Sequence, residues 1–293
     1  MRGTEVACLR HLFVITALSI AVAANAQPNT DVYLFDLAFD GDNYRLSNPT
    51  NVSNNPGYDN QPSFSSDGRF LYYTRWQSDL QTDLVEYALA SGETRRITKT
   101  DGSEYSPTEV PGGDALSTIL LERDGTQLLY AVDLAASESN VLVPNKKIGY
   151  HCWLSDGQLF SFVLGQPNKL MWHDLKNGKE EVLDSLIGRS LHKVPDELSI
   201  SYISKRSEPW TIRKYVPQSG QFIDLGPTLL DAEDLTWTQK GHILMGSGQK
   251  LYWWSKETGV WSLVADLSDH NISNITRLAV NPSSTQLALV GND

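Results

Sequence analysis

The sequence contains almost no cysteine and no long apolar segment beyond its N-terminus. Only Cys8 and Cys152 occur among the 293 residues, and Cys8 lies in a segment that we expect to be removed. An intrachain disulfide is therefore excluded in the processed chain, so packing must stabilise the fold, and a chain of this length can bury enough surface. Cys152 falls between His151 and Trp153 in a predicted strand, which indicates a small buried hydrophobe.

The N-terminus has the three-part pattern of a secretory signal peptide. Arg2 and Arg10 supply positive charge, residues 12–24 are almost all apolar, and residues 24–26 form a small-residue Ala-Asn-Ala cleavage site. The apolar run is shorter than the roughly 20 residues that a spanning helix needs. We therefore predict a signal peptide at 1–26 and an exported, periplasmic or secreted chain at 27–293. The alternative is that the segment stays uncut as an anchor.

Positive charge and catalytic signatures are also scarce. The formal net charge is -11, which disfavours nucleic acid and anionic membrane surfaces as partners. The sequence has no G-x-S-x-G, H-E-x-x-H or C-x-x-C pattern. We therefore predict no cofactor and no metal, and binding in preference to catalysis.

A repeated pair of hairpins dominates the remainder of the chain. Its fullest copy begins at residues 61–74, where Asp67 and Gly68 form a turn between two short strands. Residues 82–89 and 94–98 form a second hairpin around Ser91-Gly92-Glu93. Four short strands per unit is typical of a β-propeller blade.

Weaker copies of this unit extend along the whole chain. Turns of the first hairpin recur near Gly112, Asp156, Asp196, Gly241 and Ser283. Removing 26 of the 293 residues and dividing by six leaves about 44 residues per unit, which matches the ~40–45 residues of a four-stranded blade. We therefore predict an all-β, six-bladed propeller in a single domain. An open β-sandwich is the alternative, but it would not need a repeat of this length.

The two ends of the chain are predicted to share one blade. The chain starts with an outer hairpin over residues 31–37 and 44–46 and stops with an inner hairpin over residues 278–290. Joining these halves in a composite blade closes the ring and removes a free sheet edge.

The clearest repeat also carries a family resemblance. Residues 62–69, Pro-Ser-Phe-Ser-Ser-Asp-Gly-Arg, followed by the apolar strand at 71–73, resemble the repeat of the TolB-like propellers, and Asp59 matches their upstream acidic residue. The resemblance is specific over residues 59–98. Elsewhere only the spacing of the strands and turns is similar. It implies a periplasmic or secreted propeller that commonly serves as a protein-binding scaffold. Because the first strand begins at Asp31, we expect the propeller without the α/β domain that the Tol-system protein carries before it.

The expected fold also nominates a binding site. Propeller sites usually lie at a mouth of the central channel, so the polar residues that precede or begin the inner strands are the candidates. They are Asp59, Asn60, Glu104, Tyr105, Tyr150, His151, His192, Glu233, Asp234, Asn274 and Arg277.

Two functions remain open for this set of residues. In the first, an exported monomeric scaffold binds an envelope or secreted protein, or a small polar or saccharide ligand in the channel. In the second, a carbohydrate- or peptide-processing propeller lyase or hydrolase uses paired carboxylates and histidines at the channel mouth for acid–base chemistry. The second requires Asp59, Glu104, His151, His192 and Asp234 to converge, and His151 and His192 with a carboxylate would also suit a transition metal.

Overall fold

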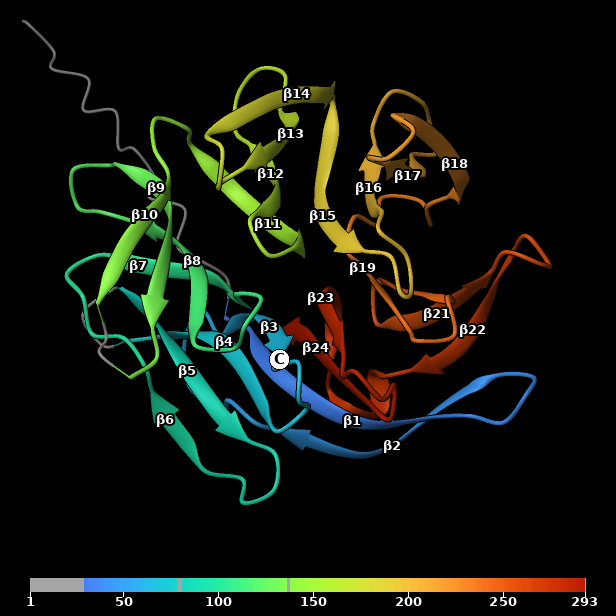
Figure 1. Cartoon of the computed structure of the whole chain (residues 1–293). Helices are drawn as coiled ribbons and strands as arrows, with labels where there is room; N and C mark the ends of the chain where they lie inside the picture. Colours follow the sequence, from blue (N-terminus) through green and yellow to red (C-terminus); the bar gives the residue numbers. More distant parts are fainter. Residues whose placement is uncertain (1–28, 78–80, 136–137, 293) are drawn as a thin grey trace, which may run out of the picture.

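The computed structural model describes residues 29–77, 81–135 and 138–292, and it confirms the all-β prediction. Six four-stranded antiparallel sheets are arranged in a ring (Figure 1). The predicted signal peptide lies outside the described residues. In the described part of the chain, the single helical element is the short 3-10 turn η1 (Ser268–His270).

Each blade has the same strand order from the channel outward. The innermost strands are β3 (Asn60–Phe64), β7 (Ser103–Glu109), β11 (Ile148–Ser155), β15 (Ile187–Lys193), β19 (Leu235–Trp237) and β23 (Ser273–Val280). The second strands are β4 (Phe70–Trp76), β8 (Ala115–Leu121), β12 (Gln158–Val163), β16 (Ile200–Ser204), β20 (Ile243–Ser247) and β24 (Gln286–Asn292). The third strands are β5 (Thr82–Ala88), β9 (Gln127–Asp133), β13 (Lys169–Asp174), β17 (Thr211–Val216), β21 (Lys250–Ser255) and β1 (Asp31–Phe39). The outermost strands are β6 (Thr94–Arg96), β10 (Ser139–Val143), β14 (Lys179–Ser185), β18 (Gln221–Pro227), β22 (Val260–Asp266) and β2 (Tyr44–Asn51).

The predicted composite blade is confirmed. Its order is β2-β1-β24-β23, so the N-terminal hairpin supplies the two outer strands and the C-terminal hairpin the two inner ones. Along this seam, Val32 pairs with Val290 and Phe35 pairs with Leu287. The ring is thus closed by ordinary antiparallel pairing between the two ends of the propeller.

The turns between the first and second strands explain why the repeat can be recognised in the sequence. Gly68, Gly157 and Gly241 all have positive φ at these turns, a conformation that glycine adopts without steric penalty. In the degenerate copies, Asp196 and Ser284 adopt the same left-handed conformation with φ of 57° and 54°. Aspartate tolerates this region better than most residues, so the turn persists where the Asp-Gly signal is lost.

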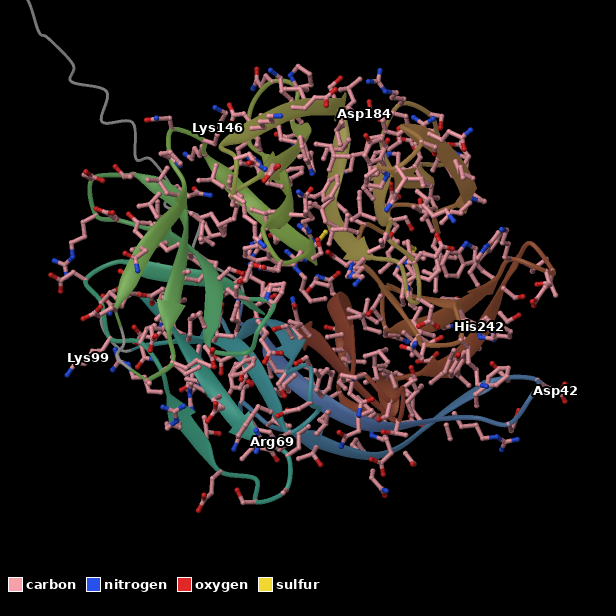
Figure 2. All side chains as sticks on the ribbon, viewed as in Figure 1. Asp42, Arg69, Lys99, Lys146, Asp184 and His242 are labelled. Carbon is pink, nitrogen blue, oxygen red and sulfur yellow. The ribbon has the colours of Figure 1, made fainter. Side chains whose placement is uncertain are left out.

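Hydrophobic packing between neighbouring blades forms the core. Six apolar clusters occur among the described residues, one at each interface between adjacent blades. At the interface of the composite blade with β20 and β21, for example, Phe35 and Leu289 pack with Leu244 and Trp253. Polar side chains such as Asp42, Lys99 and Lys146 lie around the circumference (Figure 2).

Several inner strands begin earlier than the sequence pattern suggests. The hairpin with its turn near Gly112, whose first strand we expect to start at Pro107, begins at Ser103, and the one expected from Leu278 begins at Ser273. The ladder of β7 has a register shift between Tyr105 and Thr108. Pro107 cannot donate a ladder hydrogen bond, so the strand passes through a bulge there instead of starting after it.

Candidate functional site

The inner strands enclose a central cavity of about 420 Å³. Adjacent inner strands contact one another around the ring in the order β23, β3, β7, β11, β15 and β19, and each of them, or the residue just before it, contributes lining residues. Ser66 and Lys193 line the cavity and are exposed, so it opens to solvent at the end where the inner strands finish. This end is called the open mouth below.

A charged cluster lies where the inner strands begin, at the opposite end of the cavity. Arg189 donates to Asp234 through Nε to Oδ1 at 3.1 Å and Nη2 to Oδ2 at 2.6 Å. Arg277 donates to Asp234 Oδ2 from Nη1 at 2.8 Å. Arg277 Nη2 also donates to Tyr150 Oη at 2.7 Å. We call Tyr150, Arg189, Asp234 and Arg277 the Arg–Asp–Arg cluster.

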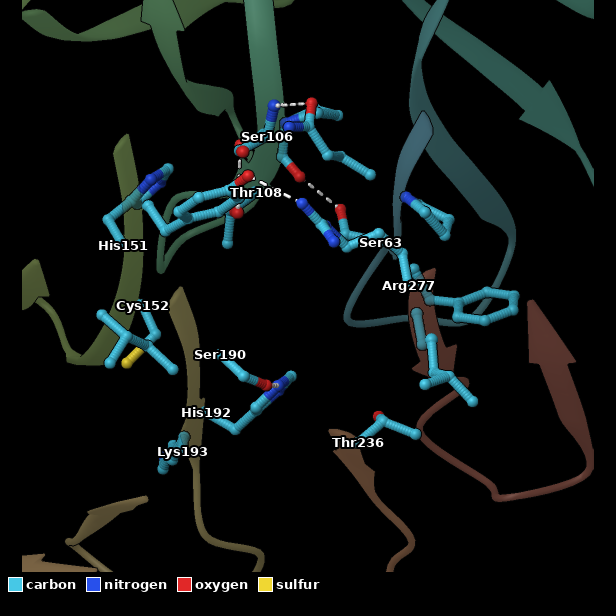
Figure 3. A pocket seen from close by; sticks show the side chains of 18 of the residues that line it. Ser63, Ser106, Thr108, His151, Cys152, Ser190, His192, Lys193, Thr236 and Arg277 are labelled. Carbon is cyan, nitrogen blue, oxygen red and sulfur yellow. Dashed lines mark hydrogen bonds between the residues drawn. The ribbon is translucent and has the colours of Figure 1, made fainter. Parts of the chain in front are cut away.

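The Arg277–Tyr150 bond crosses the channel. Arg277 lies on β23 and Tyr150 on β11, which are three positions apart in a ring of six inner strands and therefore face each other. Figure 3 shows Arg277 extending from β23 toward the side where His151 marks β11. The cluster therefore narrows one end of the cavity and leaves the open mouth as the wider entrance.

Electrostatics keep this cluster charged. Burial acts to lower the pKa of Arg189 and Arg277, but the nearby Asp234 carboxylate outweighs it and holds both values above their usual range. Tyr58 sits beside the cluster, and burial raises its pKa further above the neutral range. With two cations and one carboxylate, the cluster carries a net charge of about +1.

The two histidines of the cavity are neutral hydrogen-bonding groups. Burial lowers the pKa of His151 to about 3 and that of His192 to about 4. His151 Nε2 lies 2.6 Å from Ser117 Oγ, and His192 Nε2 lies 3.0 Å from Ser190 Oγ. Among the described residues, no group of three or more histidine, cysteine, aspartate or glutamate side chains is arranged to hold a metal ion.

Asp59 and Glu104 lie inside the blade walls and do not line the cavity. Asp59 Oδ1 accepts the backbone N–H of Trp76 at 2.9 Å, and burial raises its pKa to about 6. Glu104 accepts hydrogen bonds from Thr98 Oγ1 at 3.2 Å and from Thr100, and burial raises its pKa to about 7. Both carboxyl groups thus secure loops and strands within the second and third blades of the chain.

The remaining predicted residues lie at or just before the starts of the inner strands and do not line the cavity. Asn60 is buried and donates to Thr30 Oγ1 at 3.3 Å. The Tyr105 ring lies 6.3 Å from that of Tyr58. Glu233 Oε1 accepts the Arg189 backbone N–H at 2.7 Å. Asn274 is exposed.

The structure thus brings five of the predicted residues into one cavity. They are Tyr150, His151, His192, Asp234 and Arg277. Arg189 is the main participant that the sequence reasoning missed. It lies 45 residues before Asp234, close to one repeat, so counting back one unit along the chain would have found it.

A membrane-crossing helix is not found among residues 29–77, 81–135 and 138–292.

Comparison with known proteins gives matches in structure alone. No family model matches the sequence, and no curated protein matches it.

Solved structures match over most of the chain at low sequence identity. A putative TolB from Agrobacterium tumefaciens superposes with a TM-score of 0.69 and 14% identity, covering 90% of this chain and 98% of that one. TolB from Acinetobacter baumannii gives 0.57 and 12%, covering 90% of this chain, which spans only 64% of the TolB chain. An oligogalacturonate lyase in complex with manganese gives 0.58 and 16%, covering 86% and 83%. The chain therefore has the six-bladed β-propeller fold of the TolB structures.

Proposed function

We propose that this chain is an exported binding propeller that holds a segment of an envelope or secreted protein in its central cavity. The proposal rests on the observation that the carboxylates in the cavity already accept hydrogen bonds from protein groups. Among the described lining residues these are Glu109 and Asp234. Asp234 is engaged by two arginines, and Glu109 accepts the backbone N–H of Ser66.

General acid–base chemistry would need two groups that face one substrate bond and can exchange protons near neutral pH. Both carboxylate oxygens of Asp234 already accept hydrogen bonds from guanidinium groups, and His151 and His192 have pKa values well below neutrality. This arrangement favours recognition by hydrogen bonds and charge. The signal peptide predicted at residues 1–26 and the TolB-like fold support the same proposal.

The open mouth provides the entrance for such a partner. Lys193 is exposed at this mouth and makes no ion pair with any described residue. Reversing this charge with Lys193→Glu should weaken the binding of a partner that enters here. The substitution should leave the packing of the blades unchanged. Lys99 is exposed at the circumference (Figure 2) and serves as a matched control for charge reversal.

Affinity capture from envelope extract tests the proposal. Immobilised processed protein and its Lys99→Glu variant should enrich the same partner over an empty column, and Lys193→Glu should retain much less of it. Quantitative mass spectrometry compares the three protein eluates with the eluate of the empty column. Equal enrichment by Lys193→Glu would place the partner elsewhere on the molecule, and no enrichment by any of them would contradict the proposed function.

A further inference from the structure

The guanidinium of Arg277 has unused hydrogen-bond donors. A planar guanidinium carries five N–H donors. Nη1 donates to Asp234 Oδ2 at 2.8 Å and to the carbonyl of Thr276 at 2.6 Å, and Nη2 donates once, to Tyr150. The Nε–H and a second Nη2–H remain, and Nε is buried with no hydrogen-bond acceptor among the described residues.

On Arg189, the corresponding edge of the guanidinium, formed by Nε and Nη2, is occupied. Its Nε and Nη2 atoms both donate to the Asp234 carboxylate, at 3.1 and 2.6 Å. This is the two-point geometry in which arginine typically pairs with a carboxylate. The same pair of atoms on Arg277, in the same cluster, has no carboxylate partner within the described structure.

Two considerations favour an anion at this edge. A buried donor without an acceptor costs roughly 1–3 kcal/mol, and more for a charged group, so a ligand that accepts from it recovers that free energy. The lining also has three cations, Arg189, Lys193 and Arg277, against the carboxylates Glu109 and Asp234. With neutral histidines the cavity is therefore net positive within a chain of net charge -11.

We propose that Arg277 is a carboxylate-binding residue, which pairs through Nε and Nη2 with a carboxylate of the ligand in the cavity. This inference rests on the proposed function, so the carboxylate belongs to a peptide segment, as its C-terminus or an acidic side chain. Although Nε itself is covered, 14% of the Arg277 side-chain surface is exposed. Lys193 at the open mouth attracts the same charge toward the cavity.

Nitrogen-15 NMR of the arginine Nε–H groups tests the pairing directly. The probe is N-acetylalanine, with N-acetylalaninamide as its uncharged match, and Arg277→Lys assigns the resonance. The Arg277 Nε–H signal should move downfield and saturate with the acid and stay in place with the amide. The Arg189 signal should move little, because its edge is already occupied. An Arg277 signal that does not move, or that moves equally with sodium chloride at the same ionic strength, would overturn the proposal.

A second set of titrations identifies the source of the carboxylate. Glucuronate carries the same group on a sugar, so tighter binding of glucuronate than of N-acetylalanine would contradict a peptide ligand. By calorimetry, Arg277→Lys should bind N-acetylalanine about tenfold more weakly, since lysine cannot make the two-point contact. If the envelope partner is captured equally by wild type and Arg277→Lys, this inference fails while the proposed function stands.

Discussion

Replacing Asp234 with asparagine should destabilise the propeller strongly. Asp234 neutralises part of the charge of Arg189 and Arg277, and the three side chains are 10%, 32% and 14% exposed. Removing one partner of a buried ion pair typically costs 3–5 kcal/mol, because the other charge stays buried without compensation. The partial exposure of Arg189 places this case at the low end, at about 3 kcal/mol.

For a chain of this size, each kcal/mol lowers the melting temperature by roughly 2–4 °C. Asp234→Asn should therefore melt about 6–12 °C below wild type by circular dichroism or calorimetry. Asp156→Asn is the control, since Asp156 pairs with Lys176 where both side chains are largely exposed, and it should melt as wild type does.

A double variant separates charge from packing. Arg189→Gln combined with Asp234→Asn removes one of the two uncompensated cations, so it should recover part of the loss in melting temperature. A melting temperature of Asp234→Asn equal to that of wild type would contradict the stabilising role of the Arg–Asp–Arg cluster. A double variant less stable than the sum of its single changes predicts would contradict that role as well.

Three further predictions concern pH, ring closure and packing. Burial raises the pKa of Glu104 from 4.5 to about 7, so its contribution to stability is present below about pH 4.5 and is lost as pH rises through 7. The difference in melting temperature between wild type and Glu104→Gln should therefore change across this pH window. A constant difference would contradict the raised pKa. Deleting residues 31–47 removes all of β1 and half of β2 and opens the ring, so the product should lack a cooperative thermal transition, whereas an unchanged melt would refute the closure. Gly57→Ala places a Cβ 2.5 Å from the Trp76 indole at a φ of 114°, and it should cost at least about 1–3 kcal/mol in a denaturant titration, where an unchanged midpoint would refute the tight contact.

The architecture was predictable because its signals are local. The Asp67-Gly68 turn and its weaker copies set the strand boundaries, and the repeat length set the number of blades. The composite blade followed from the order of hairpins at the two ends. These features depend on turn chemistry and spacing, which the sequence carries directly.

The direction of the site side chains was harder to predict. Alternate residues of a strand face opposite sides, so a single bulge exchanges the two faces. Register shifts interrupt β3 between Asn60 and Ser63 and β23 between Ser273 and Arg277. Asp59 and Glu104 lie just before register shifts in β3 and β7, and both turn into the blade walls although they occupy the expected position along the chain.

Photo-crosslinking in envelope extract tests the central claim most directly. A benzoylphenylalanine at Ser66 lies on the rim of the open mouth, and one at Lys99 lies exposed on the circumference. The binding propeller predicts an ultraviolet-dependent adduct with another envelope protein from position 66 and none from position 99. An adduct from position 99 alone, or none from either position, would contradict the central cavity as the binding site.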